Sequence, residues 1–268
     1  MGAAKNAAPE ALFLHCSLAH LGAWRGVAKA LEGDLSMLMM DLPGHGKSAA
    51  YDIADPKLDY QDLALSWALA LLNAEADGPV DLVGHSFGAT IALRLAQVAP
   101  DRVRSLTLIE PVLFAAAQTH PLFAENTAYM EGPFADAMRA GDKGEAARLF
   151  NDLWGNGTAW EALPERVRKD MAARIDLIPV AKNVTHGDVH GQVAPGALEA
   201  LDMPCLLIEG GNSPAIIAAI HDVFEARIPD VRRVVTQGAG HMAPITHPVQ
   251  VARALHDFLT AAPRLPPR

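Results

Sequence analysis

The stretch PVDLVGHSFGATIALRLAQ, residues 79–97, decides the fold. Val80-Asp81-Leu82-Val83 is typical of a short buried strand, and Ala89 to Gln97 carries apolar residues at helical spacing. Between them, Gly84-His85-Ser86-Phe87-Gly88 matches G-x-S-x-G in the strand–turn–helix context that gives this pattern meaning. The glycines lack Cβ atoms, so the strand and the helix can approach closely. The stretch predicts that Ser86 is a nucleophile on a strained turn; the alternative is a serine that only caps the helix.

Length, composition and charge are those of a soluble globular protein. A chain of 268 residues is long enough for one α/β domain with an insertion, and 50% hydrophobic and 20% charged residues are ordinary proportions. The net charge of −9 argues against nucleic acid as a partner, because phosphate binding needs a basic surface. No stretch approaches the roughly 20 apolar residues of a membrane span, so we expect no membrane partner.

Cysteine usage and the N-terminus indicate a reducing compartment. Cys16 and Cys205 fall in or beside expected strands, and the N-terminus lacks the charged leader and long apolar run of a secretory signal. We therefore expect free, buried thiols in a cytoplasmic protein. We further expect a monomer or a homodimer.

Strands and helices alternate along most of the chain. The expected strands are residues 11–15, 36–41, 80–83, 104–109, 205–209 and 232–236. One helix is expected to begin near residue 24, and four more are expected over residues 59–76, 89–99, 215–227 and 249–260. This alternation predicts a mostly parallel, doubly wound sheet with helices on both faces. Functional residues should then lie in the loops at the carboxyl ends of the strands.

Residues 112–198 break the alternation. They carry helical patches at 122–130, 134–140 and 144–154, separated by Gly and Pro, and many large apolar residues that need burial. We predict a helical cap over residues 112–198, inserted into an α/β core formed by residues 1–111 and 199–268.

The base that serine chemistry needs is expected to be His241. It lies in Gly238-Ala239-Gly240-His241-Met242, directly after the last expected strand and after Ser86 in chain order. We interpret four further histidines as ordinary surface or capping residues: His20, His120, His221 and His256. A metal site at His186 and His190 is not favoured, because Gly187 argues against a helix and no third ligand is evident.

Two backbone N–H donors should bind the oxyanion of the reaction. The N–H of Phe87, at the start of the helix, is one. The other should come from the loop after the first strand, where we favour Ser17 over Cys16 or Leu18. We expect His15 and Asp41 to have structural roles nearby.

Together these stretches resemble the α/β-hydrolase family, in its cap-bearing form. The motifs that carry the resemblance are His15-Cys16 with Trp24, residues 41–48 (DLPGHGKS), residues 84–88 (GHSFG) and residues 240–248 (GHMAPITHP). The resemblance implies Ser86 as nucleophile, His241 as base, and Phe87 and Ser17 as oxyanion donors. The chain departs from the family in Cys16, where Gly is usual, and in having no room for the N-terminal hairpin. The resemblance thus implies about six strands in the order 2-1-3-4-5-6.

The carboxylate that orients the base is the third departure. The family commonly places it in the loop Glu209-Gly210-Gly211-Asn212-Ser213-Pro214, but Ser213 stands where Asp is expected. Glu110, at the end of the preceding strand, reaches the same region, as in some cap-bearing relatives. We favour Glu110, with Glu209 second and Asn212 or Asp222 behind. A solvated Glu110 that only begins the insertion is the alternative.

These residues favour a serine hydrolase that cleaves a carboxylic ester or related small acyl substrate without a metal or an organic cofactor. Carbon–carbon bond hydrolases, cofactor-free haloperoxidases or perhydrolases, and a receptor or scaffold that hardly turns over stay open. We expect an apolar substrate pocket over Ser86, lined by Phe114, Phe123, Met130, Phe134, Trp154 and Met242.

Overall fold

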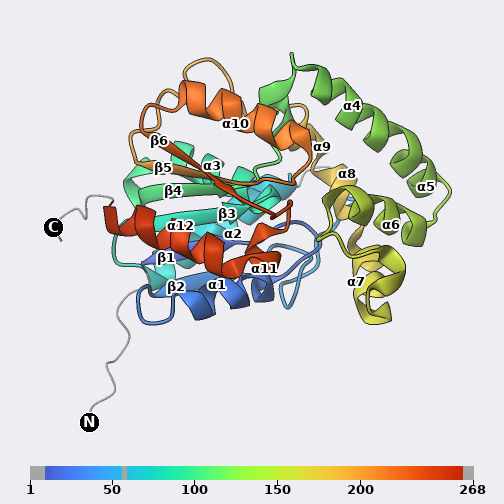
Figure 1. Ribbon diagram of the computed structural model, residues 1–268, viewed down its shortest axis with the longest axis horizontal. Helices are drawn as coiled ribbons and strands as arrows, with labels where there is room; N and C mark the ends of the chain where they lie inside the picture. The colour runs from blue at the N-terminus through green and yellow to red at the C-terminus, as the bar shows by residue number, and fades with distance from the viewer. Residues whose placement is uncertain (1–9, 56–58, 262–268) are drawn as a thin grey trace, which may run out of the picture.

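Residues 10–55 and 59–261 are described in the computed structural model, which is built on a sheet of six parallel strands (Figure 1). The strands are β1 (Ala11–Leu14), β2 (Met37–Met40), β3 (Val80–His85), β4 (Val103–Ile109), β5 (Cys205–Gly210) and β6 (Val231–Thr236). Their spatial order is β2-β1-β3-β4-β5-β6. The predicted parallel sheet and its strand order are confirmed. Residues 1–9, on which the missing hairpin depends, lie outside the described residues.

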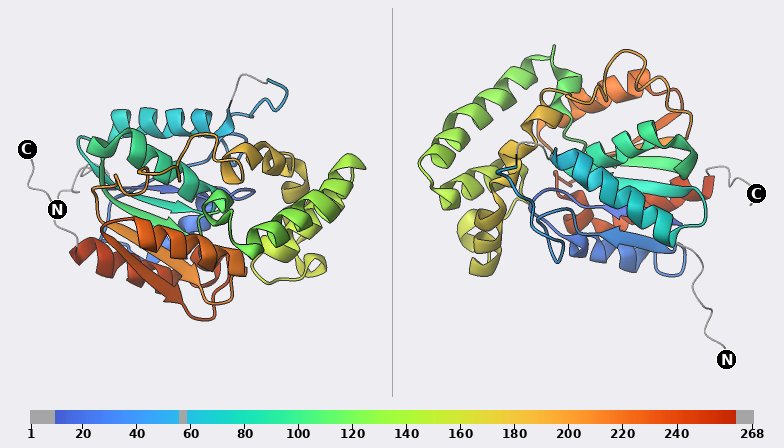
Figure 2. Two further views of the ribbon diagram at one scale, coloured as in Figure 1. Left: turned by 90° about the horizontal axis from the view of Figure 1, so that it is seen from above. Right: turned by 180° about the vertical axis from the view of Figure 1, so that it is seen from behind.

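Helices cover both faces of the sheet (Figures 1 and 2). One apolar cluster joins Phe13 of β1 to Trp24, Val27 and Leu255, and so packs one face against α1 (Arg25–Ala30) and α12 (Pro248–Ala261). The other face packs against α2 (Tyr60–Glu75), α3 (Phe87–Val98) and α10 (Ala215–Arg227). The strands are buried on both faces: β1 is a continuous apolar run, and every residue of β3 is buried, including Asp81 and His85.

Between β4 and β5 the described chain is helical, and Figure 1 shows this part at one end of the sheet. Its elements are η3 (Phe114–Ala117), α4 (Pro121–Tyr129), η4 (Met130–Phe134), α5 (Ala135–Arg139), α6 (Lys143–Trp154), η5 (Trp160–Ala162), α7 (Glu165–Arg174), α8 (Leu177–Val180) and α9 (Lys182–Thr185). Buried Phe134, Ala146 and Ile175 give it a small apolar cluster of its own. The division into cap and core stays a prediction.

The break between α4 and α5 has a local cause. Gly132 has non-helical dihedral angles, φ −93° and ψ −106°, and Pro133 has no N–H to continue the helical ladder. The chain is therefore kinked where Gly and Pro separate the two helical patches expected there.

Both cysteines are free and buried, as expected. Burial raises the pKa of each thiol, Cys16 and Cys205, to about 12, so both stay protonated at neutral pH. Among the described helices, none combines the length and the apolar character that crossing a lipid bilayer would need.

The turn between β3 and α3 depends on two glycines. A Cβ on Gly84 would lie 2.4 Å from the carbonyl oxygen of Gly88, and a Cβ on Gly88 would lie 2.4 Å from the carbonyl oxygen of Leu14. Backbone atoms cannot give way to such contacts without moving the strand or the helix. The two glycines therefore bring the N-terminus of α3 against the end of β1.

We predict that Gly88→Ala lowers the free energy of unfolding by about 1–3 kcal/mol, the usual cost of overpacking. The matched control is Gly144→Ala in α6, where the nearest atom to a new Cβ is Asp142 Oδ1 at 3.5 Å. That change should be neutral or slightly stabilising, because alanine favours helix by up to about 1 kcal/mol. Urea unfolding of both variants measures the difference, and equal stabilities would refute the steric argument.

Candidate active site

Ser86 sits between the last residue of β3 and the first residue of α3. Its φ of 56° lies in the left-handed region, and its N–H donates to the carbonyl of Ile109 at 2.9 Å. Four non-glycine residues of the described chain have a positive φ, and three of them, Leu18, Ser86 and Glu110, belong to this region. Such strained backbone costs about 1–3 kcal/mol per residue and clusters at functional sites.

The loop between β6 and α11 (Ala243–Thr246) brings His241 to Ser86. His241 Nε2 lies 3.0 Å from Ser86 Oγ, and His241 Nδ1 lies 3.0 Å from Glu110 Oε2. Because Nδ1–H donates a hydrogen bond to the carboxylate, Nε2 carries no proton and can accept the one from the Ser86 hydroxyl. His85 Nε2 also donates to the carbonyl of His241 at 2.8 Å, which ties the loop to β3.

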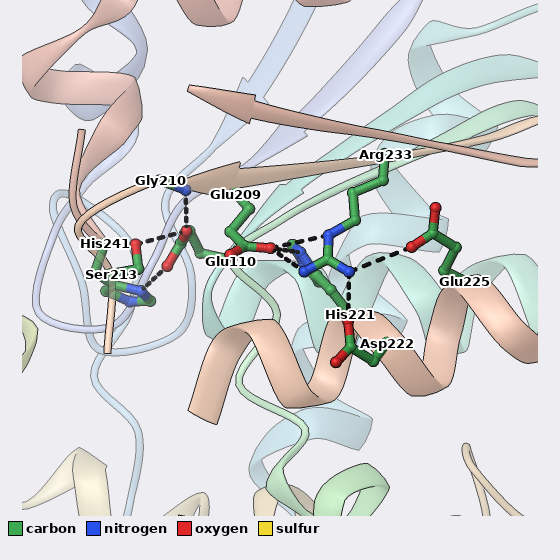
Figure 3. Close-up of polar contacts among 9 residues, drawn as sticks. All are labelled: Glu110, Glu209, Gly210, Ser213, His221, Asp222, Glu225, Arg233 and His241. Atoms are coloured by element: carbon green, nitrogen blue, oxygen red, sulfur yellow. Dashed lines mark hydrogen bonds and ion pairs between the residues drawn. The ribbon is translucent and has the colours of Figure 1, made fainter. Parts of the chain in front are cut away.

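Glu110 is completely buried, and three donors compensate for its charge (Figure 3). Its Oε1 accepts from the N–H of Gly210 at 2.6 Å and from Ser213 Oγ at 2.8 Å, while Oε2 faces His241. Buried carboxylates need such partners, because desolvation of an unpaired charge is costly. Ser213, which stands where the family usually has an acid, therefore serves as a hydrogen-bond donor to Glu110.

Glu209 belongs to a separate polar group beside Glu110 (Figure 3). Its Oε2 accepts from Arg233 and faces His221 Nδ1 at 3.2 Å. Burial would raise the pKa of Glu209, but hydrogen bonds from His221 and Arg233 outweigh it and the pKa falls. Asp222 pairs with Arg233, and Asn212 Nδ2 donates to the carbonyl of Gly238. Of the four candidates considered for the acid, only Glu110 hydrogen-bonds to His241 in the described part of the chain.

One expectation about the other histidines is wrong. His20 and His120 do cap backbone N–H groups, of Gly22 and Leu122. His221, expected at the surface or in a cap, is instead completely buried, because its face of α10 packs against the sheet beside Glu209.

Phe87 and Ser17, the residues expected to supply the oxyanion donors, both line the cavity over Ser86. Phe87 is the first residue of α3, so its N–H has no partner within the helix. The N–H of Leu18 donates to His45 Nε2 at 3.0 Å and is thereby committed. Ser17 lines the same cavity as Ser86 and Phe87, so its N–H suits the second position better than that of Leu18.

Neutral histidines hold the loop that carries Ser17. His15 Nδ1 donates to the carbonyl of Cys16 at 2.7 Å, and its Nε2 accepts the N–H of Leu42 at 2.9 Å. Burial lowers the pKa of His15 to about 3 and that of His45 to about 4. Asp41 accepts from the N–H groups of Leu21 and Lys47. His15 and Asp41 thus have the structural contacts expected of them.

A cavity of about 490 Å³ lies over Ser86 and is walled mainly by residues between β4 and β5. Of the expected pocket residues, four line it: Phe114, Met130, Phe134 and Trp154. Two do not line it. Phe123 is half-buried and packs against the core beside His186, with ring centroids 5.9 Å apart, and Met242 lines a neighbouring cavity.

Further lining residues come from α8, α9 and the links between them, which the sequence analysis missed: Ile178, Pro179, Ala181, Lys182, Thr185 and His186. Each of these helices has four residues, and Pro179 lies inside α8, so neither gives a helical period. His186 contacts Phe114, whereas His190 pairs with Asp59, so these two histidines have different partners.

This arrangement can perform nucleophilic acyl transfer. It combines a hydroxyl, a base that can accept its proton, a carboxylate that orients the base, and N–H donors for a developing oxyanion. Trp154 packs its ring against His241, with centroids 4.9 Å apart, and limits the access of water.

Comparisons with known proteins agree with this geometry. Residues 12–248 match a family model described as alpha/beta hydrolase fold. Esterase YbfF of Escherichia coli is 28% identical over 245 residues, which cover 91% of this chain and 89% of the relative. A pimeloyl-[acyl-carrier protein] methyl ester esterase of Xanthomonas campestris is 29% identical over 257 residues, covering 95% and 96%. A thermophilic esterase has a similar fold, with a TM-score of 0.71 at 21% identity, over 95% of this chain and 90% of that one.

We predict that acid destabilises the protein through its buried histidines. The pKa values of His15, His45 and His85 are about 3–4, below the 6.5 of an unperturbed histidine. The unfolded chain therefore binds protons that the folded chain does not, so stability is complete above about pH 6.5 and is lost as the pH falls toward 3. Each histidine should contribute a slope of about 1.4 kcal/mol per pH unit.

His15→Gln tests this slope. The amide can keep both hydrogen bonds of the imidazole but does not titrate. Urea unfolding between about pH 4 and pH 7 should show a slope smaller by about 1.4 kcal/mol per pH unit than that of the wild type. Identical slopes would contradict the assignment of a neutral His15.

Proposed function

Because the chain belongs to the α/β-hydrolase family, we propose that it is a serine hydrolase that cleaves carboxylic esters through an acyl-enzyme on Ser86. The observation that carries this proposal is the hydrogen-bonded series from Ser86 Oγ through both ring nitrogens of His241 to Glu110 Oε2, at 3.0 Å in each step.

In the first half of the reaction, Ser86 Oγ attacks the ester carbonyl carbon while its proton passes to His241 Nε2. The imidazolium that forms is stabilised by Glu110, whose other carboxylate oxygen accepts hydrogen bonds from the N–H of Gly210 and from Ser213 Oγ. The bond between the carbonyl carbon and the alcohol oxygen then breaks, and His241 returns the proton to the leaving alcohol. The acyl group is left on Ser86.

The N–H groups of Phe87 and Ser17 stabilise the negative oxygen of each tetrahedral intermediate. Losing one such donor typically lowers kcat by about 100- to 1,000-fold. The loop that carries Ser17 is therefore important for the rate, and it is held in a strained conformation, since the next residue, Leu18, has a positive φ. In the second half, His241 takes a proton from water, the hydroxide attacks the acyl carbon, and Ser86 is released with its proton.

The substrate class follows from the cavity. Phe114, Phe134 and Trp154 are among the rings that line it, which favours a small or medium hydrophobic acyl group. The names of the two curated relatives describe ester cleavage, and we propose the same reaction class here.

Kinetics of ester hydrolysis by two variants tests the proposal. Ser86→Ala removes the nucleophile, and Glu110→Gln leaves His241 without the carboxylate that fixes its tautomer. Each should lower kcat by about 1,000-fold or more while the protein stays folded. The substrates are p-nitrophenyl esters of short fatty acids, and circular dichroism checks the fold.

Glu209→Gln is the matched control for Glu110→Gln, because it makes the same change on the neighbouring strand. It should retain kcat within about 10-fold, since Glu209 contacts Arg233 and His221 and not His241. Loss of turnover in Glu209→Gln alone would transfer the role of the acid to Glu209. A folded wild type that binds esters without hydrolysing them would favour the receptor hypothesis.

A further inference from the structure

The side chain of Trp154 joins the helical segment after β4 to the base of the site. Trp154 is the last residue of α6, and its ring centroid lies 4.9 Å from that of His241, with 68° between the ring planes. Rings at this distance and angle touch, with the edge of one against the face of the other. Trp154 is buried and lines the cavity over Ser86. It therefore contacts the group that carries the proton in the proposed reaction.

Local contacts hold Trp154 in this place. The ring of Phe114 packs against it, with centroids 5.6 Å apart. Helix α6 ends at Gly155, whose N–H donates to the carbonyl of Asn151 at 2.8 Å, and a Cβ on Gly155 would lie 2.3 Å from that carbonyl oxygen. Asn151 Nδ2 donates in turn to the carbonyl of Thr158 at 3.2 Å. The end of α6 is thus fixed, and the indole with it.

The other groups around His241 leave one part of its ring to Trp154. Nδ1 faces Glu110 and Nε2 faces Ser86, so the carbon atoms and the faces of the imidazole remain. His85, with its ring centroid 5.3 Å away, also contacts the imidazole. Burial lowers the pKa of His85 to about 3, so His85 is neutral and brings no second positive charge.

Proton transfer places a positive charge beside the indole. When His241 takes the proton of Ser86, the charge spreads over the whole imidazolium ring. The face of an indole carries a negative potential and attracts a cation within about 6 Å of the ring centroid, most strongly where water is excluded. The same indole has little effect on a neutral imidazole, so this contact favours the protonated form.

We propose that Trp154 is a positioning residue that stabilises the imidazolium form of His241 through the face of its indole ring. The inference rests on the proposed function, because the charge arises in each half of the reaction when His241 acts as the base. It gives α6 a part in the chemistry in addition to its place in the wall of the cavity.

Fluorescence tests the contact without any substrate. An imidazolium quenches the emission of a tryptophan that it touches, so the emission of the wild type should fall as the pH is lowered from about 9 to about 5 and His241 is protonated. This quenching should be absent in Trp154→Phe and in His241→Gln, whose amide takes up no proton. Trp24 lies beside His85, with centroids 6.2 Å apart, but His85 stays neutral in this range and adds no signal. Equal titration curves in the wild type and in both folded variants would overturn the proposal.

Kinetics separates this role from simple packing. In Trp154→Leu, kcat on p-nitrophenyl esters should fall by about 2- to 30-fold, and the acid limb of the pH profile of kcat/KM should move to lower pH by about 0.4–1.5 units. The limb moves in this direction because His241 is protonated less readily without the indole and stays a base to lower pH. Trp154→Phe keeps an aromatic face and should lie between the wild type and Trp154→Leu. A fall in kcat with the acid limb unmoved would show a merely structural role.

The matched control is Phe150→Leu, which removes a ring one turn earlier on α6. Phe150 lines the same cavity, but in the described part of the chain its ring contacts Phe134, with centroids 6.5 Å apart, and not His241. The variant should change KM, because the wall of the cavity changes, and leave the acid limb and the fluorescence titration as in the wild type. An acid limb moved as far as in Trp154→Leu would refute the role of the contact. A wild type that hydrolyses no ester would count against the proposed function instead, since the fluorescence titration needs no substrate.

Discussion

The close approach of α3 to β1 at Gly88 is the constraint on which the rest of the site depends. No side chain fits there, because a Cβ would lie 2.4 Å from the carbonyl oxygen of Leu14 and 2.5 Å from that of His15. The contact sets the N-terminus of α3, with the free N–H of Phe87, beside the loop that carries Ser17. The two oxyanion donors that we propose come from distant parts of the chain, and both are backbone N–H groups, so no flexible side chain has to be ordered for them to act.

Around this contact, buried polar groups fix each loop in one conformation. His15 and His45 hold the loop after β1 in their neutral form, and His85 ties the loop of His241 to β3. Glu110 is the one fully buried group in this set that needs a charge, and Gly210 and Ser213 provide the donors that make its burial possible. The strained backbones of Ser86 and Glu110 are each held to the adjacent strand, since the N–H of Ser86 donates to the carbonyl of Ile109 and the N–H of Glu110 donates to that of Ile208.

The alternation of strands and helices predicted the parallel sheet, and the residues that meet at Ser86 could be predicted because each lies at the end of an expected strand. The strand order came from the family resemblance. Glu110 could be chosen over Glu209 since Ser213 left the usual position without an acid. The cavity was harder to predict. Both Phe114 and Phe123 are phenylalanines in the inserted region, and nothing in the local sequence tells which of them lines the cavity. The packing of α4 places Phe123 against the core. Four-residue helices such as α8 and α9 carry no period, so Lys182 and His186 could not be assigned to the wall. His221 is buried because its face of α10 packs against the sheet, where it contacts Glu209 of β5, a contact between two elements that no local pattern encodes.

The central claim is that Ser86 is activated by His241, and reaction with a fluorophosphonate tests it most directly. Intact mass spectrometry and peptide mapping of the treated protein should find one phosphonyl group, on Ser86, and His241→Ala should slow its addition by at least about 100-fold. A folded protein that stays unmodified, or that is labelled at another residue, would contradict the account.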